Sequence, residues 1–184
     1  MHDKFSNPIV QRLNDWAPIE QSEEETADWR TADLAADFLQ RDHDKPFFLA
    51  CGIYRPHLSW YVPKKYFDMH PLEEIQLPPY KQNDLEDVPP MGRRMAGEAF
   101  NIIKKHGQWK KSVQGYLAAC SFADACVGRV LGALEKSKYR DNTIVVLWGD
   151  HGYHRRRKKP LLQIGSVERG LSNAADYLRA GRIK

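Results

Sequence analysis

Residues 143–152 read TIVVLWGDHG, a run of β-branched and aromatic residues that ends at an acid, an imidazole and a glycine. An apolar run without polar alternation predicts a strand of a parallel sheet that is buried on both faces. In open α/β sheets, ligands bind beyond the carboxyl ends of such strands, so polar side chains placed there are candidates for chemistry. Asp150 and His151 are therefore candidate metal ligands. In the alternative interpretation, Asp150 starts a turn and His151 is solvated.

Residues 45–53, KPFFLACGI, form a second strand-like run, and the polar residues YRPH come directly after it. A proline biases the residue before it toward an extended conformation. Because Pro56 and Pro63 both come after this run, we expect a fixed loop here rather than a helix.

This loop can hold His57, Lys64 and Lys65 beside an acidic metal site. Such an arrangement suits an anionic substrate, because the metal and the cations share the neutralisation of its charge. The alternative is a surface loop with a half-buried histidine and a solvated pair of lysines.

Two further segments have helical periodicity. Ser22 and Glu25 make a capping box, and apolar residues then recur at helical spacing as far as residue 39. A longer apolar stripe predicts a helix over residues 110–138, followed by a turn into the run at residue 143. The proline-rich segment 71–109 is expected to be an irregular connection with one short helix at about residues 95–105. Alternating helices and strands predict an α/β fold.

The composition is that of a globular chain. Its 184 residues are 42% hydrophobic and 11% aromatic, which is enough for the core of one domain. We expect no membrane span, because no stretch of about 18 apolar residues was found, and no leader peptide, because residues 1–13 contain no apolar segment. The three cysteines have no metal or redox spacing. The oligomeric state is left open.

Three segments together resemble a known family. They are PFFLACGIYRPHLSWYVPKKYFDMHPLEEIQLP at 46–78, YLAACSFADACVGRVLGALE at 116–135 and NTIVVLWGDHGYH at 142–154. In order and spacing they resemble the sulfatases, in particular the iduronate-2-sulfatase-like branch. The resemblance implies an α/β alkaline-phosphatase-like fold, with a mainly parallel sheet flanked by helices, of which residues 1–154 are an incomplete catalytic domain. It also implies a hydrolase of sulfuric esters that acts on a sulfated sugar or similar small molecule or glycan, in a periplasmic or extracellular compartment.

The resemblance also implies roles for individual residues. The aspartate and histidine of the DHG segment, here Asp150 and His151, are expected to bind calcium, although an imidazole is an unusual ligand for this hard cation. The histidine of the RPH segment, His57, is expected to contact the substrate sulfate or to assist the leaving group. Lys64 and Lys65 are expected to bind the substrate or to flank its pocket.

Other features depart from the family pattern. Sulfatases use a formylglycine nucleophile made from the cysteine of a C-x-P-S-R motif, and none of Cys51, Cys120 and Cys126 has that context. Two further metal-binding aspartates are also missing. We therefore expect an internal piece of the domain that is inactive by itself. The alternatives are a phosphodiesterase or phosphonate hydrolase of the same superfamily, or a non-enzymatic remnant that binds polyanions.

Residues 155–184 form a basic tail. They contain nine Lys and Arg and two Asp and Glu, a net charge of +7, whereas residues 1–154 have a net charge of −3. A cationic run of this kind is typical of arms that bind nucleic acid or anionic surfaces. Read one base out of frame, however, its possible codons encode a segment that resembles the one after DHG in sulfatases. We therefore expect a frameshift near His154, with Gln163 where the family has a lysine, a disordered tail, and no nucleic-acid partner.

Overall fold

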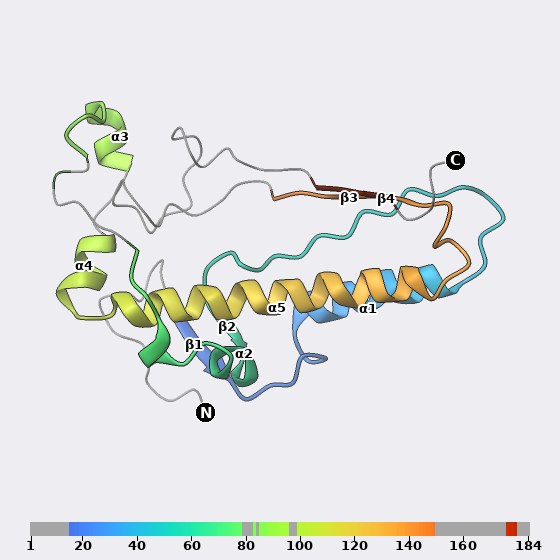
Figure 1. The fold of residues 1–184 in the computed structure, drawn as a ribbon, viewed down its shortest axis with the longest axis horizontal. Coiled ribbons are helices and arrows are strands. Elements are labelled where there is room, and N and C mark those ends of the chain that lie inside the picture. Colours follow the sequence, from blue (N-terminus) through green and yellow to red (C-terminus); the bar gives the residue numbers. More distant parts are fainter. Residues whose placement is uncertain (1–14, 79–82, 84, 96–98, 150–175, 180–184) are drawn as a thin grey trace.

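The computed structural model describes residues 15–78, 83, 85–95, 99–149 and 176–179 (Figure 1). The following elements occur in chain order: β1 (Trp16–Ile19), α1 (Ala27–Gln40), β2 (Trp60–Pro63), α2 (Lys64–Asp68), the 3-10 helix η1 (Leu72–Glu74), α3 (Pro90–Met95), α4 (Ala99–Lys105), α5 (Trp109–Glu135), β3 (Ile144–Leu147) and β4 (Asp176–Arg179). Helices α1 and α5 pack along each other and form the framework on which the other elements lie (Figure 1).

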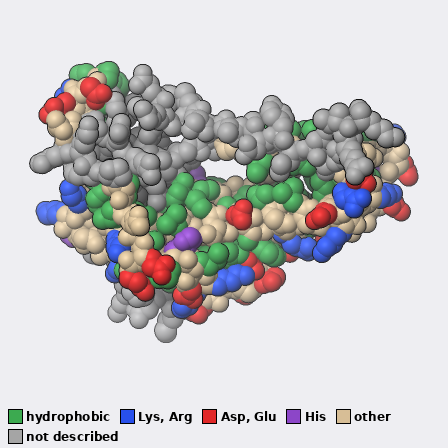
Figure 2. Space-filling model, viewed as in Figure 1, with side chains coloured by type: hydrophobic (Ala, Val, Ile, Leu, Met, Phe, Trp, Pro, Cys, Tyr) green, Lys and Arg blue, Asp and Glu red, His purple; other side chains and the backbone are tan. Residues whose placement is uncertain are grey.

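Helix α5 confirms the longer of the two predicted helices. Its inner face is lined by small and aromatic side chains, among them Ala118, Ala119 and Phe122, which are buried against α1, β2 and α2. The small side chains allow close approach of the neighbouring elements. On the face seen in Figure 2, hydrophobic side chains gather along α5, and charged side chains lie between them and along the outline of the molecule.

The expectation that no segment is apolar enough for a membrane span is corrected by α5. By length and composition this helix could cross a membrane, although a core helix of a folded domain passes the same test. Here α5 packs against α1, α2, β1 and β2. Its buried face therefore has protein partners.

Helix α1 begins at Ala27, later than the capping box had indicated. The Glu25 carboxylate accepts a hydrogen bond from the Ser22 N–H, which is half of the expected box. The hydroxyl of Thr26 caps the helix instead, since it accepts from the Trp29 N–H at 3.4 Å. Thr26 also donates to the Glu23 carbonyl, and this turn delays the start of the helix.

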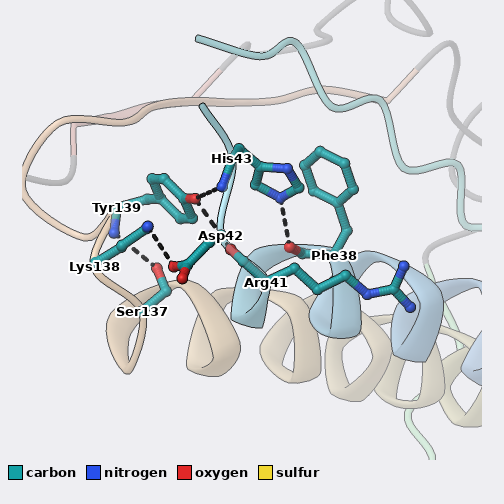
Figure 3. A network of polar contacts seen from close by, with 7 residues as sticks. All are labelled: Phe38, Arg41, Asp42, His43, Ser137, Lys138 and Tyr139. Atoms are coloured by element: carbon teal, nitrogen blue, oxygen red, sulfur yellow. Dashed lines mark hydrogen bonds and ion pairs between the residues drawn. The ribbon is translucent and has the colours of Figure 1, made fainter. Parts of the chain in front are cut away.

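Side chains at the C-terminal ends of α1 and α5 join the two helices (Figure 3). The Tyr139 hydroxyl accepts from the His43 N–H at 2.9 Å and donates to the Arg41 carbonyl at 3.0 Å. His43 Nε2 lies 2.9 Å from the Phe38 carbonyl, and its ring stacks on Phe38 at 4.0 Å. An exposed ion pair between Lys138 and Asp42 lies beside this cluster. These contacts fix where the chain leaves each helix.

The prediction of a strand at residues 45–53 is wrong, because this segment forms no hydrogen-bonded ladder with the described residues. The segment is extended, but the structure assigns no ladder to it. Phe47 and Leu49 pack on the cluster formed by Ala36, Leu39, Ala133 and Leu134, whereas Phe48 is 92% exposed. Alternate side chains of this segment thus face the helices as they would in a strand, but its backbone forms no ladder with a described strand.

Strand β3 confirms the run at residue 143 as a strand, but its predicted environment is wrong. It pairs with β4 in antiparallel register, with Val145 opposite Leu178, rather than in a parallel sheet. Val145 packs on the helices, while Ile144 is 74% exposed and Trp148 64%. Among the described elements, α1 and α5 form a single layer beneath the strand and cover one of its faces (Figure 1). The parallel pairing in the described residues is between β1 and β2.

Where it is described, the segment 71–109 contains the 3-10 helix η1 and the two short α-helices α3 and α4, whereas one short helix was expected. Ile103 and Phe100 of α4 are buried in the core, and Phe100 packs edge-on against Trp109 at 5.1 Å. Gly107, with φ +65°, ends α4 in the left-handed conformation that glycine favours. Within the basic tail, residues 176–179 form β4, and the remaining tail residues lie outside the described part of the chain.

Candidate functional site

The loop that carries His57 is anchored at its beginning by Asp28. This residue lies in the first turn of α1 and is buried. Its carboxylate accepts hydrogen bonds from the backbone N–H groups of Tyr54, at 2.8 Å, and Arg55, at 3.2 Å. Hydrogen bonds that involve an ionised carboxylate are stronger than neutral ones. Asp28 therefore fixes the chain where the extended segment ends and the loop begins.

The other end of the loop is anchored by Trp60, which begins β2. Trp60 is fully buried, and its indole N–H donates to the Pro56 carbonyl at 2.7 Å. Its backbone N–H donates to the Asp15 carbonyl, next to the parallel ladder of β1 and β2. A buried ring with a satisfied N–H holds its position strongly. The prediction of a fixed loop before Pro63 therefore agrees with the structure, although its last residues form β2.

The imidazole of His57 is held through one nitrogen. Nδ1 lies 2.5 Å from the Leu58 carbonyl oxygen and 2.7 Å from the Tyr54 hydroxyl. The rings of Tyr54 and His57 are stacked with centroids 4.4 Å apart. Among the described residues, no hydrogen-bond partner is assigned to Nε2. His57 is partly exposed, so this second nitrogen is available to a ligand.

Arg55 contributes positive charge two residues before this histidine in the chain. Its guanidinium donates to the Tyr61 carbonyl at 3.2 Å and lies over the Tyr54 ring, 5.4 Å from the centroid. No ion pair joins it to a carboxylate in the described part of the chain, and its Nε is buried without a hydrogen-bond partner there. The positive charge of Arg55 is thus not neutralised by a described acid.

Lys64 and Lys65 lie in the first turn of α2, after the loop and β2. The Lys64 ammonium pairs with Asp68 one turn further on, at 2.5 Å. Lys65 pairs with Glu23 at 2.6 Å, and Glu23 also accepts from the Tyr66 hydroxyl. Both lysines are therefore engaged with carboxylates rather than simply solvated. The Lys64–Asp68 pair is exposed on both sides and contributes little stability, so Lys64 can exchange partners at low cost, whereas the Glu23 partner of Lys65 is largely buried.

The expected metal ligands Asp150 and His151 lie outside the described residues. Within residues 15–149, as far as these are described, no group of three or more His, Cys, Asp or Glu side chains is arranged to hold a metal ion. The described part of the chain therefore does not by itself form the calcium site that the resemblance implies.

Two residues of the site were missed by the sequence analysis. Asp28 carries no local signal beyond an acid in the first turn of a helix, and its partners lie 26 and 27 residues further along the chain. Tyr54 was noted only as the polar end of an apolar run. The available clue was its position three residues before His57. At this spacing the chain makes a turn, in which the His57 N–H donates to the Tyr54 carbonyl.

Comparison with known proteins gives consistent similarities. The family model described as Sulfatase matches residues 2–176, a range that runs into the basic tail. A sulfatase of Formosa agariphila is 44% identical over 145 residues, which is 76% of this chain and 28% of that protein. Iduronate 2-sulfatase of Mus musculus is 34% identical over 123 residues, 59% of this chain and 22% of that protein. An arylsulfatase of Clostridium perfringens is 34% identical over 127 residues, 63% of this chain and 24% of that protein. The chain spans about a quarter of the length of these curated relatives.

Proposed function

Because this chain belongs to the sulfatase family, we propose that it forms part of the catalytic domain of a sulfuric ester hydrolase of the iduronate-2-sulfatase-like branch. The proposed substrate is a sulfated sugar or a similar sulfate ester, met in a periplasmic or extracellular compartment. The observation that carries the proposal is His57, held through Nδ1 with Nε2 left available. The anchors at Asp28 and Trp60 keep this nitrogen in place without a ligand.

The chemistry of His57 depends on which nitrogen it presents. Sulfate oxygens only accept hydrogen bonds, so the protonated imidazolium can donate from Nε2 to the sulfate. The same Nε2 proton can pass to the alcohol that leaves when the ester bond breaks. Arg55, whose charge is not neutralised by a described acid, adds positive potential to this part of the chain. Both effects favour an anionic substrate.

We propose that Lys64 and Lys65 flank the sulfate rather than forming its main contact. Each ammonium has three donors, and a carboxylate partner does not use all of them. Their ion pairs with Asp68 and Glu23 hold them at the start of α2. Their contribution is therefore general positive potential, which salt screens strongly at exposed positions.

Asp150 and His151 are proposed to contribute part of a calcium site. Calcium needs about six to eight oxygen ligands, so two side chains must be supplemented by others. When bound, calcium would polarise the sulfate ester. The sequence contains no C-x-P-S-R cysteine, and we therefore propose that this chain does not turn over sulfate esters by itself.

The test is a binding titration of this chain with 4-nitrophenyl sulfate, followed through the His57 ring signals by NMR. We expect a saturable shift of the ring signals that His57→Gln identifies as those of His57, and no release of nitrophenol above background. Bis(4-nitrophenyl) phosphate is the matched probe for the phosphodiesterase alternative. Tighter binding of the phosphodiester, or the absence of any shift at His57, would overturn the sulfatase assignment of this site. Turnover lost in His57→Ala would overturn the proposed inactivity.

A further inference from the structure

We propose that Tyr54 is the positioning residue of His57. Together with the Leu58 carbonyl, it keeps the single ring proton of the neutral imidazole on Nδ1. Nε2 is then the atom at which His57 gains and loses a proton toward the substrate. This role rests on the proposed function, because the orientation matters only if an anion or a leaving group meets Nε2. The contacts that carry it are properties of the chain itself.

The first step concerns the Leu58 carbonyl. A carbonyl oxygen can only accept hydrogen bonds, and it lies 2.5 Å from His57 Nδ1. An unprotonated Nδ1 would place a lone pair against this oxygen at that short distance. The contact is favourable only when Nδ1 carries a proton. In the neutral ring, Nε2 is then the unprotonated nitrogen.

The second step concerns the Tyr54 hydroxyl. It lies 2.7 Å from Nδ1 and 3.2 Å from the Leu58 carbonyl. Since Nδ1 has no free lone pair in this arrangement, the hydroxyl proton points to the carbonyl and the hydroxyl oxygen accepts from Nδ1. Tyr54 therefore supplies a second acceptor for the same ring proton. Its ring, stacked on the imidazole at 4.4 Å, limits rotation of His57.

The third step connects this pair to the framework. The Tyr54 N–H donates to Asp28 on α1, and the Tyr54 carbonyl accepts from the His57 N–H at 3.0 Å. The Arg55 guanidinium lies over the Tyr54 ring. These contacts hold the backbone and the ring of Tyr54. Through Tyr54, the imidazole therefore has a defined position relative to α1.

The experiment is a long-range proton–nitrogen NMR correlation on the nitrogen-15-labelled full chain, in which the two ring nitrogens of His57 are distinguished by whether they carry a proton. His57→Gln identifies the signals. Above the titration midpoint found in the same spectra, we expect Nδ1 to be protonated and Nε2 not. In Tyr54→Phe, which keeps the ring, the ratio of Nδ1–H to Nε2–H should fall about fivefold, the effect of one lost hydrogen bond. Tyr61→Phe is the matched control, since its hydroxyl bonds to Asp15 and not to His57.

A wild-type ring protonated at Nε2 would overturn the inference without any variant. An unchanged ratio in Tyr54→Phe would overturn the role of Tyr54. Neither result depends on sulfate, so a failure of this inference is distinguishable from a failure of 4-nitrophenyl sulfate to bind.

Discussion

At the scale of single residues, Tyr66 and Cys126 are side chains in the core that the folded chain keeps protonated. Burial raises the pKa of the Cys126 thiol to about 12, and the nearby charges of Asp28 and Glu23 act in the same direction. Burial also raises the pKa of Tyr66, as does its hydrogen bond to the Glu23 carboxylate. Both groups lose their protons more easily in the unfolded chain, where nothing shields them from water.

We predict that the chain becomes less stable at alkaline pH. Both folded pKa values are raised, so the stabilisation is fully present below the unfolded values of 9.0 for the thiol and 10.0 for the phenol. It is lost as the pH rises toward the folded values, because the unfolded chain then binds fewer protons. Urea denaturation near pH 8 and near pH 11 measures the difference.

Tyr66→Phe is the informative variant, because it keeps the buried ring and removes the hydroxyl that bonds to Glu23. The loss of stability between the two pH values should be smaller in this variant than in the wild type. An equal loss would mean that the alkaline effect arises elsewhere.

At the scale of elements, the glycines of α5 have different surroundings. A Cβ added at Gly115 would lie 2.8 Å from the Trp16 Cβ and 3.0 Å from its Cγ, so α5 and β1 could not keep their spacing. At Gly128 and Gly132 an added Cβ would meet nothing within 4 Å. The same substitution should therefore have opposite effects along one helix.

We predict that Gly115→Ala lowers the free energy of unfolding by about 1–3 kcal/mol, the usual effect of overpacking. Gly128→Ala should raise it by about 0.5–1 kcal/mol, because alanine favours the helical backbone. Urea denaturation of both variants tests this. Equal effects of the two substitutions would show that Trp16 does not press against α5 in solution.

The helices were more predictable from sequence than the strands, for a physical reason. The predicted apolar stripe that includes Val113, Val130 and Leu134 repeats within one element, so α5 could be located from its own residues. The environment of a strand depends on partners far away in the chain. The local sequence pattern therefore could not predict that Phe48 and Ile144 are exposed, or that β3 pairs with an antiparallel strand.

The same distinction applies to the candidate site. His57 was found because polar residues follow an apolar run in its segment, and because this segment resembles that of a family. Asp28 was missed because its contact with Tyr54 joins residues on different elements. The pairing of Lys65 with Glu23 joins α2 to the turn before α1 and was missed for the same reason.

At the scale of the whole molecule, the alkaline-phosphatase-like fold class predicted from the sequence is confirmed by the family match. The two long helices, α1 and α5, form one layer. The extended segment before His57 and β3 lie along one side of this layer in Figure 1, and β1, β2 and α2 lie along the other. The charge is divided unevenly, with a net of −3 in residues 1–154 and +7 in the basic tail. The division of the chain at His154 stays a prediction.

We predict that removal of residues 155–184 changes the free energy of unfolding by less than about 1 kcal/mol, even though it removes β4. The reason is the size of the β3–β4 ladder, which joins two strands of four residues, and an isolated pair of strands is only marginally stable in water. Five consecutive cations at 155–159 provide trypsin sites, so brief digestion of the full chain should first yield a product that ends in this run. The matched comparison is a chain whose reading frame is restored by one base after His154.

If the tail was never selected to complete the fold, the restored chain should be more stable than the present one and should carry a lysine in place of Gln163. A large loss of stability on deletion, together with no gain on restoration, would show that β4 is an integral strand and that the frameshift interpretation is wrong.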